Sequence, residues 1–278
     1  MTNYNIRSAY NRAWCPQDFE CSSFGRELDK AIKSFQKENR LKADGFAGPK
    51  TIKVLKSLSP KENSIVCGLE RIPIPKRTKV ILWTEEEGYK AKEGSYRPVY
   101  KKRTINMMVN HWDACKSSKD AIRVLNSRNL SAQYLIDENG DIYETMNDNY
   151  IGYHCGNLNR YTIGVEICNP YYIKHQSKTN PRRIVKNKYV HGKKMRDHLD
   201  FHDVQIQSLM DLWVAINKGH EIPIQTPTKD GKEVGTIYAP AMNNQYRGQV
   251  HHYNLSRGKI DCGGLDLVDL VEKIKKTQ

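Results

Sequence analysis

The apolar residues between positions 24 and 58 recur at the spacing of two amphipathic helices. Those of the first predicted helix lie one to four residues apart on one face and are Leu28, Ala31, Ile32 and Phe35. Two turn pairs, Asp44-Gly45 and Gly48-Pro49, break this periodicity. It resumes from Pro49 to Leu58, with proline in the first turn, where a helix tolerates it. The pattern predicts a small helical bundle over residues 1–58.

Residues 59–76 mix prolines with charges and predict a linker, so that residues 77–278 form a second unit. In this unit strand-like and helical periodicities alternate along the chain, which predicts an α/β fold. The predicted strands are residues 79–84, a run from Thr104 that ends at His111, a hairpin turning at Asn139-Gly140, and residues 161–168. The predicted helices are residues 117–128, 203–218 and 265–275.

Length and composition exclude several classes of protein. A chain of 278 residues accommodates one full-sized domain and a smaller module. No apolar run approaches the roughly eighteen residues that span a bilayer, and the first fifteen residues lack the apolar segment of a secretory signal. We therefore expect synthesis in the cytoplasm and no signal peptide. Seven scattered cysteines, an odd number, argue against a disulfide framework and for reduced thiols.

The formal net charge of +14 predicts an anionic partner, which could be nucleic acid, a membrane surface or a cell-wall polymer. Residues 171–202 hold nine Lys or Arg and two Asp, so this stretch supplies half of the excess and reads as an exposed insertion. A solvated basic face is its default interpretation, and contact with an anionic polymer is the alternative. The stretch shows neither a clear recognition helix nor clear base-stacking aromatics, so we expect no nucleic-acid partner.

The segment His251–Asp266, HHYNLSRGKIDCGGLD, gathers imidazole, carboxylate and thiol groups in one short loop. Zinc binds all three, and a catalytic zinc takes three protein ligands and leaves one position open. For such a cluster taken alone, a histidine-rich surface turn is the alternative. Two other residues attract attention: His111 ends a predicted buried strand, and Glu166 lies among apolar neighbours, where a carboxylate is costly to bury without a partner.

Four segments in a fixed order resemble the zinc-dependent N-acetylmuramoyl-L-alanine amidases of the type 2 family, relatives of the peptidoglycan recognition proteins. They are the strand ending in His111, SAQYLIDENGDIY, IGVE, and a terminal H-x-x-L with K-x-D. The resemblance covers residues 77–278 and implies a central mixed β-sheet flanked by helices, with one bound Zn²⁺. It implies His111 as the first metal ligand. His252 is implied as the second, because Leu255 follows it at the family's spacing, and His251 as a neighbour.

The third ligand in this family is Asp or Cys, and the sequence offers Asp261 and Cys262 side by side. A catalytic lysine commonly precedes the ligand by two residues. Lys259 has this spacing to Asp261, whereas Cys262 would place Ile260 in the lysine's position. We therefore expect Asp261, with Cys262 as the alternative.

The same resemblance implies roles for the remaining site residues. Glu166 would transfer the proton of the attacking water to the leaving amine, and Lys259 would stabilise the oxyanion. His154 falls where relatives have a substrate-side W-H-A-G segment, although the flanking tyrosine and cysteine depart from it. Some members use a tyrosine at the start of the hairpin strand; Ala132 or Gln133 falls there in this chain, which favours Glu166.

The N-terminal helices resemble the second half of a peptidoglycan-binding module found on bacterial and phage wall hydrolases. The matching residues are Ala31, Phe35, Gln36, Leu41, Asp44, Gly45, Gly48, Thr51 and Leu55. The resemblance makes Asp44 and Gly45 candidates for wall binding. Residues 1–23 do not show the usual first half, and a helical bundle without a ligand is the alternative.

The combined prediction is a modular phage endolysin: a monomeric peptidoglycan amidase made in the cytoplasm of the infected host and acting on the cell wall after release. A bacterial wall-recycling amidase is the nearest alternative, although it would have no use for a wall-binding module. A non-catalytic peptidoglycan-recognition protein would be expected to have lost a zinc ligand, and this sequence retains candidates for all three.

Overall fold

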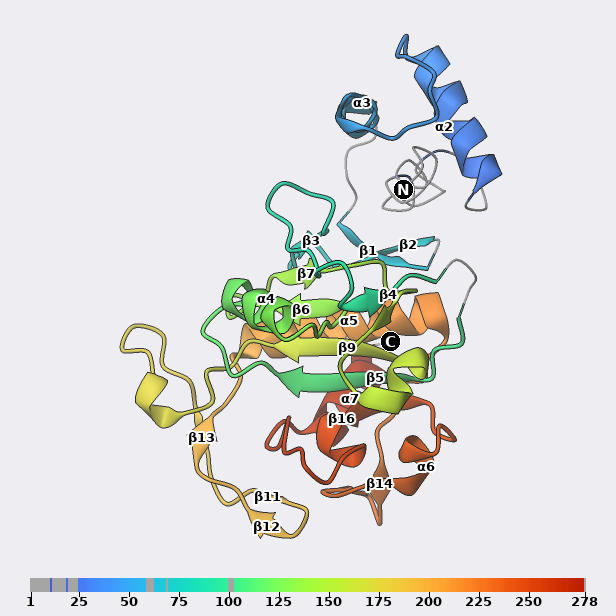
Figure 1. Ribbon diagram of the computed structural model, residues 1–278. Coiled ribbons are helices and arrows are strands. Elements are labelled where there is room, and N and C mark those ends of the chain that lie inside the picture. Colours follow the sequence, from blue (N-terminus) through green and yellow to red (C-terminus); the bar gives the residue numbers. More distant parts are fainter. Residues whose placement is uncertain are drawn as a thin grey trace.

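The computed structural model describes residues 11, 19, 25–58, 63–68, 70–99 and 103–277. The two N-terminal helices are α2 (Arg26–Glu38) and α3 (Pro49–Leu58), close to their predicted positions (Figure 1). Their apolar faces meet in a small core of their own, formed by Phe19, Leu28, Ile32, Ala47, Ile52 and Leu55. Apart from Asn11 and Phe19, residues 1–23 lie outside the described residues. The prediction that these residues lack the usual first half of the module therefore also lies outside them.

A six-stranded sheet in the order β16-β5-β9-β6-β7-β3 forms the centre of the second unit (Figure 1). Its strands are β3 (Val80–Ile81), β5 (Met107–Trp112), β6 (Tyr134–Ile136), β7 (Ile142–Glu144), β9 (Thr162–Ile167) and β16 (Gly248–His251). Strands β16, β5, β9 and β6 are parallel neighbours, whereas β7 runs antiparallel to β6. The sheet is therefore mixed, and the prediction of a central mixed sheet is confirmed.

Helices cover both faces of this sheet because its strands are apolar on both sides. The three helices that cover it are α4 (Ser118–Ser127), α5 (Asp203–His220) and α7 (Leu267–Thr277). The main core joins α5 and α7 to alternate strand residues such as Met108 and Val165. On the other face, Leu125 of α4 packs against Leu135 of β6. The side-chain period of two thus separates each strand into a core-facing set and a set that faces α4.

Short two-stranded ribbons and single turns decorate this centre. The ribbons are β1 (Ser64–Cys67) with β2 (Glu70–Pro73), β4 (Tyr96–Arg97) with β8 (Ile151–Gly152), β10 (Ile184–Val185) with β13 (His198–Leu199), β11 (Tyr189–Val190) with β12 (Lys193–Lys194), and β14 (Thr228–Lys229) with β15 (Lys232–Glu233). The short helical turns are η2 (Gly156–Tyr161), η3 (Ile173–His175), α6 (Ala239–Met242) and η4 (His252–Asn254).

The segment expected to be a linker differs most from the prediction. Within residues 59–76, β1 and β2 form an antiparallel hairpin, and Ile65, Val66 and Ile72 lie in the main core against α5. The prolines and charges of this stretch are typical of a linker, but its few apolar residues complete the core. Strand β16 was not predicted either, because Val250 is the one aliphatic residue in a sequence that is nevertheless wholly buried.

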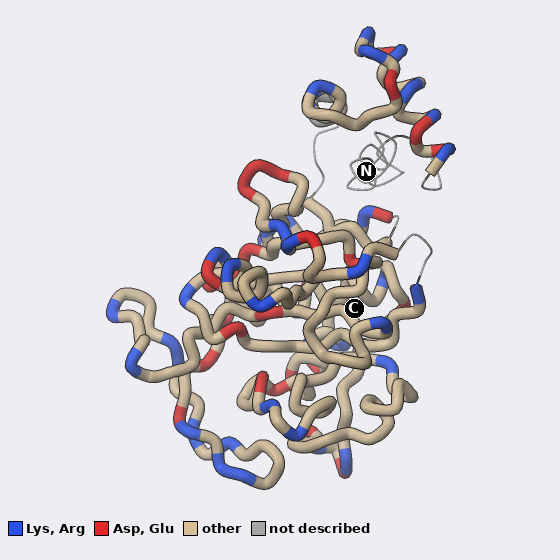
Figure 2. Tube along the Cα trace, viewed as in Figure 1, with Lys and Arg blue, Asp and Glu red and all other residues tan. Residues whose placement is uncertain are grey.

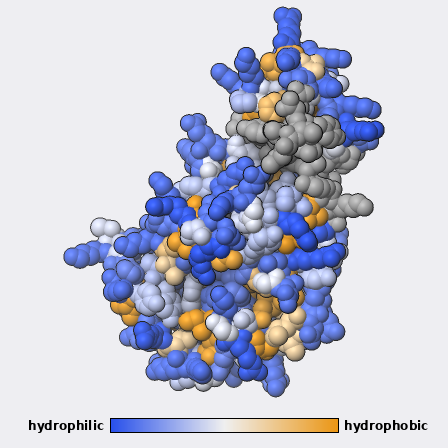
Figure 3. Space-filling view, viewed as in Figure 1, coloured by the Kyte–Doolittle hydropathy of each residue, from blue (hydrophilic) through white to orange (hydrophobic). Residues whose placement is uncertain are grey.

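The surface is mostly polar. Figure 3 shows hydrophilic residues over most of the visible face, with apolar residues in small separate groups. Among the described residues, no helix combines the length and the apolarity that crossing a bilayer requires.

The hairpin of β1 and β2 yields a test of its place in the core. Ile65 is fully buried, so Ile65→Ala is expected to lower the free energy of unfolding by about 2–5 kcal/mol through the cavity it leaves. The matched control is Glu70→Ala, an exposed position in the same hairpin, which should change it by less than about 0.5 kcal/mol. Urea denaturation measures the unfolding free energy of both variants. Equally small changes in the two would contradict a core position for the hairpin and favour a linker.

Candidate functional site

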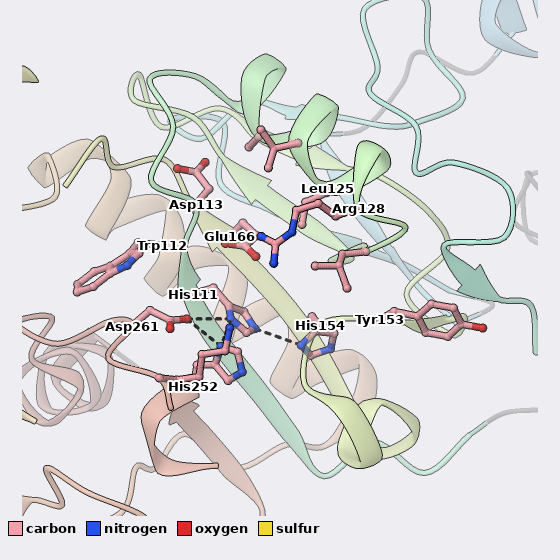
Figure 4. Close-up of a pocket in the computed structure, with 14 residues that line it drawn as sticks. His111, Trp112, Asp113, Leu125, Arg128, Tyr153, His154, Glu166, His252 and Asp261 are labelled. Atoms are coloured by element: carbon pink, nitrogen blue, oxygen red, sulfur yellow. Dashed lines mark hydrogen bonds and ion pairs between the residues drawn. The ribbon is translucent and has the colours of Figure 1, made fainter. Parts of the chain in front are cut away.

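The register of the parallel strands places His111 and Glu166 side by side. His111 of β5 is paired with Glu166 of β9, and both project toward the face that α4 covers, since their neighbours Met108 and Val165 face the main core. Both residues stand near the carboxyl ends of their strands, where parallel strands open onto a shared edge. Figure 4 shows the two side chains above this part of the sheet.

Strand β16 brings the terminal motif to the same edge, because it pairs in parallel with the other side of β5. The adjacent histidines then separate. His251 turns away and its Nε2 lies 2.8 Å from Glu233 Oε1, whereas His252, at the start of η4, directs Nδ1 to within 2.9 Å of His111 Nδ1. The structure thus brings together the two histidines predicted as ligands and separates His251 from them.

Asp261 and Cys262 also point in different directions. Asp261 Oδ2 lies 2.9 Å from His252 Nδ1 and 3.1 Å from His111 Nδ1. Cys262 is wholly buried in the main core. Burial raises the pKa of its thiol well above the usual value, and the charge of Asp261 adds to the rise. Of these two neighbours, Asp261 is therefore the one that faces the histidines.

The three converging donors suit a divalent cation. Tetrahedral bonds of about 2.0–2.2 Å separate ligand atoms by about 3.3 Å, close to the distances among these three atoms. Burial lowers the pKa of His111 to about 4, so its imidazole is neutral, as a metal ligand must be. Burial acts to raise the pKa of Asp261, but its close contacts with His111 and His252 lower this pKa overall, so the carboxyl group is ionised. Two imidazoles and one carboxylate match the donor set of a zinc site.

A chain of hydrogen bonds fixes which nitrogen of His111 faces this point. The Thr162 hydroxyl donates to Leu158 O at 3.0 Å and so accepts from His154 Nε2, 3.2 Å away. Burial lowers the pKa of His154 well below its usual value, so its ring is neutral and Nδ1 is an acceptor. His111 Nε2–H consequently donates to His154 Nδ1 at 3.1 Å, which leaves the lone pair of His111 Nδ1 aimed at His252 and Asp261. His154, expected near the substrate, contacts a predicted ligand directly.

The glycine of the IGVE segment makes room for that ring. A Cβ at Gly164 would lie 2.8 Å from His154 Cγ, closer than carbon atoms approach, so a side chain there would displace the imidazole. The Gly164 amide also donates to Gln133 Oε1 at 2.7 Å, so the backbone of this segment is held by a neighbouring strand.

Glu166 and Lys259 line one cavity of about 130 Å³ together with the three converging residues (Figure 4). Burial raises the pKa of Glu166 well above its usual value, and the nearby Asp113 and Asp261 raise it further, against Lys259 and Arg128. A second hollow of about 620 Å³ adjoins it and shares His154, His252 and Lys259 in its wall. The site thus adjoins a larger hollow with which it shares part of its wall.

Two residues that the sequence analysis did not single out face Glu166. Asp113 follows β5 by one residue, and burial raises its pKa to about 8. Arg128 caps the C-terminus of α4, and its guanidinium lies beside Glu166 in Figure 4. Helix α4 was predicted, but periodicity alone does not say what its last residue faces. Asp113 is two residues after His111, and this spacing was a signal in the sequence, because side chains two positions apart in an extended chain point to the same face.

The structure also gathers Cys67, Asp148 and His220, a second group whose composition could hold a metal. Here each oxygen of the carboxylate already has a partner: Gly68 N donates to Oδ1 at 2.7 Å, and His220 Nε2 lies 2.6 Å from Oδ2. All three side chains are buried. We interpret this group as a hydrogen-bonded junction that fastens the β1–β2 hairpin to the end of α5, because its charge is already paired.

In the N-terminal module, Asp44 and Gly45 belong to an internal network. Asp44 Oδ1 accepts from Gln36 Nε2 and Phe46 N, each at 3.0 Å, and the Gly45 amide donates to Gln36 Oε1 at 2.9 Å. Gly45 has φ of 72°, a conformation that favours glycine. Both residues thus build the turn between α2 and α3, and their predicted contact with the wall stays a prediction.

Comparison with known families assigns the chain. Residues 101–259 match the N-acetylmuramoyl-L-alanine amidase family, and residues 10–55 match the peptidoglycan binding domain family. The first match covers more than half of the 278 residues, so the chain belongs to the N-acetylmuramoyl-L-alanine amidase family. It is an amidase of the kind that acts on peptidoglycan, and it carries a peptidoglycan-binding module ahead of the amidase domain. No curated protein matches the chain.

Solved structures of amidases are also similar to this chain. AmpD is 14% identical, with a TM-score of 0.39 over 69% of this chain and 96% of its own. The endolysin LysCS from Clostridium intestinale is 12% identical, with a TM-score of 0.41 over 71% and 95%. The Ph2119 endolysin from a Thermus scotoductus bacteriophage is 14% identical, with a TM-score of 0.40 over 70% and 98%. At such values the family assignment depends on the sequence match.

The buried junction around Asp148 yields a prediction of stability and its pH dependence. Asp148→Asn is expected to cost about 3 kcal/mol or more of unfolding free energy at pH 7, because it leaves buried Arg103 and His220 without their anion. Burial acts to raise the pKa of Asp148, but its interactions with His220 lower it overall. The folded state therefore binds fewer protons than the unfolded one near pH 4, and this stabilisation disappears as pH falls below about 4.

Urea titrations from pH 7 to pH 3 measure both effects. The variant should lose stability at neutral pH and show a shallower decline in acid than the parent. Asp269→Asn, which removes an exposed ion pair with Lys273, is the control and should cost less than about 1 kcal/mol. A parent-like stability of Asp148→Asn at pH 7 would contradict the junction.

Proposed function

We propose that this chain is a zinc-dependent endolysin that hydrolyses the amide between N-acetylmuramic acid and L-alanine in peptidoglycan. The observation that carries the proposal is the convergence of His111, His252 and Asp261 on one point, beside Glu166, inside a domain of the amidase family. Three ligands and an open cavity are the arrangement of a catalytic zinc rather than a structural one.

His111, His252 and Asp261 would hold the metal. When bound there, Zn²⁺ supplies Lewis acidity that polarises a carbonyl and activates water near neutral pH. The hydrogen-bond chain through His154 supports this assignment, since it keeps the proton of His111 on Nε2 and the Nδ1 lone pair free. His154 then acts as a positioning residue for the ligand, the role that hydrogen-bond acceptors behind zinc-bound histidines commonly have.

Glu166 suits the transfer of a proton. Its pKa is raised by burial, so its carboxyl group binds a proton more readily than an exposed one and can pass it on. In the proposed reaction Glu166 takes a proton from the attacking water and delivers it to the departing amine of L-alanine. Lys259, on an exposed loop at the wall of the cavity, stabilises the negative oxygen that develops on the former carbonyl.

The alternatives differ in what they require. A non-catalytic recognition protein needs neither a complete set of metal donors nor a proton carrier. In this chain one cavity is lined both by three candidate donors and by Glu166 as candidate proton carrier. A wall-recycling amidase would use the same chemistry on soluble fragments. The match of residues 10–55 to a peptidoglycan-binding family favours insoluble wall and therefore an endolysin, which we expect to be monomeric and to act after release from the host cytoplasm.

The first prediction concerns the metal. The purified protein should bind about one zinc per chain, and His111→Ala, His252→Ala and Asp261→Ala should each lose the metal and wall hydrolysis together. Cys262→Ala is the control for the third ligand and should keep its zinc, as should Asp148→Asn from the second group. Elemental analysis after dialysis measures the content. Loss of zinc from Cys262→Ala with retention in Asp261→Ala would transfer the ligand role to Cys262.

The second prediction separates catalysis from metal binding. Glu166→Gln should keep zinc and lose about a hundredfold or more in kcat, because glutamine preserves the shape but cannot carry the proton. Lys259→Ala should also keep zinc and lose about 3 kcal/mol of transition-state stabilisation. Rates on soluble muropeptides and zinc content are measured on the same samples. Parent rates in both variants would refute these two roles.

The third prediction concerns the N-terminal module. Removing residues 1–58 should leave the rate on soluble muropeptides nearly unchanged while weakening co-sedimentation with insoluble peptidoglycan, because tethering raises the local substrate concentration without touching the reacting atoms. The truncation keeps the β1–β2 hairpin, which completes the core. An equal loss on soluble and insoluble substrates would mean that the module has a structural role.

A further inference from the structure

The basic insertion, residues 171–202, has no part in the chemistry proposed above. Part of it nevertheless lies against the loop that carries Lys259 and Asp261. Figure 2 shows Lys and Arg distributed along this arm. Of its nine basic residues, Arg182 alone is buried, and the others are exposed. The exposed charged residues therefore face solvent, while the contacts with the loop of Lys259 and Asp261 are made by apolar and imidazole side chains.

The ribbon of β11 and β12 packs directly on the backbone beside Asp261. Val190 and Met195, which are both buried, share a small core with Tyr171 and Tyr253. A Cβ at Gly263 would collide with Met195 Sδ and lie 2.8 Å from Val190 Cγ2. The ribbon thus touches the chain two residues after the predicted third ligand.

His191 ties the ribbon to the loop on the other side of that ligand. It forms the two-residue turn of the ribbon with Gly192, and both have positive φ, of 54° and 74°, as this tight turn requires. The ring points to Lys259, whose carbonyl oxygen lies 3.0 Å from Nε2. A carbonyl can only accept, so Nε2 carries the proton, and the Thr236 hydroxyl donates to Nδ1 at 3.1 Å.

His198 makes a second tie from the same insertion. Its Nε2 lies 2.9 Å from Gly263 O, and its buried ring stacks on Tyr171 at a centroid distance of 5.0 Å. Two imidazoles of the insertion therefore hold the carbonyl groups of residues 259 and 263, which bracket Asp261. Residues 257–260 are exposed, so the part of the loop that carries Lys259 has little core packing of its own, whereas Cys262 anchors the part after Asp261 in the main core.

We propose that the insertion is a brace for the catalytic loop, and that His191 is the positioning residue that keeps Lys259 and Asp261 in register with the two histidines. This inference rests on the proposed function for the role of those residues. This role of residues 171–202 depends on the side chains that contact the loop, and not on the exposed charges. The physical basis is preorganisation: a ligand and a lysine held in place need not be ordered when the metal or the transition state forms.

The test is His191→Gly, since glycine keeps the positive-φ turn while removing the ring. In the metal-free protein, amide hydrogen exchange of residues 256–264 is expected to accelerate about tenfold, the scale of one lost hydrogen bond. The zinc Kd should rise and kcat on soluble muropeptides should fall by a similar factor, with KM within about twofold of the parent. An unchanged exchange rate and zinc Kd would overturn the proposal.

Two further variants sharpen this result. His175→Ala alters an exposed histidine of the same insertion, whose ring contacts Tyr172, and should match the parent in all three measurements. Thr236→Val removes the hydroxyl that fixes the ring's tautomer, and should shift exchange and zinc Kd in the same direction by a smaller factor; it carries the test if His191→Gly does not fold. Acceleration throughout the chain, instead of within residues 256–264, would also overturn the brace.

Exchange and metal affinity do not require hydrolysis. If the parent binds zinc but cleaves no peptidoglycan, the proposed function fails, and the brace is still decided by these two measurements. If the parent cleaves peptidoglycan and His191→Gly behaves as the parent does, the function holds and the brace fails.

Discussion

The parallel pairing of β5 with β9 is the constraint on which the site depends. It sets His111 opposite Glu166 on one face, and the pairing of β16 on the other side of β5 brings His252 to the same edge. A slip of one residue would turn either side chain into the main core. The apolar residues that alternate with them, packed on α5 and α7, hold this register and therefore the distance between the proposed metal ligand and the proposed proton carrier.

Hydrogen bonds near these paired strands orient the side chains of the site and have no part in the proposed chemistry. His154 fixes the tautomer of His111, and Gly164 provides the space for its ring. On the other side of the site, the insertion holds the loop of Asp261 through His191. The site is thus supported from β9 and from the insertion, and under the proposed function metal affinity and rate would depend on residues that touch neither metal nor substrate.

Two buried carboxyl groups, those of Asp148 and Glu166, differ in their partners. The buried carboxylate of Asp148 has partners on both of its oxygens, whereas Glu166, among Asp113 and Asp261, has a raised pKa. The first arrangement fits a junction between β1 and α5, and the second fits the proton transfer proposed for Glu166. The same physical terms therefore distinguish a structural carboxylate from a reactive one, although both lie among histidines or acids that could suggest a metal.

The sequence alone determined the α/β alternation, the extents of α3, α4 and α5, and the order of the segments that resemble the amidases, because periodicity and motif spacing are local properties. Tertiary structure decided the rest. Strand β16 has a single aliphatic residue, and prolines and charges flank the β1–β2 hairpin; both segments are strands because the sheet edge and the core bury them. Asp261 and Cys262 differ by one position, so spacing favoured Asp261 and the fold alone showed which side chain faces the histidines. The contact of His191 with Lys259 joins residues 68 positions apart, a separation over which no local pattern extends.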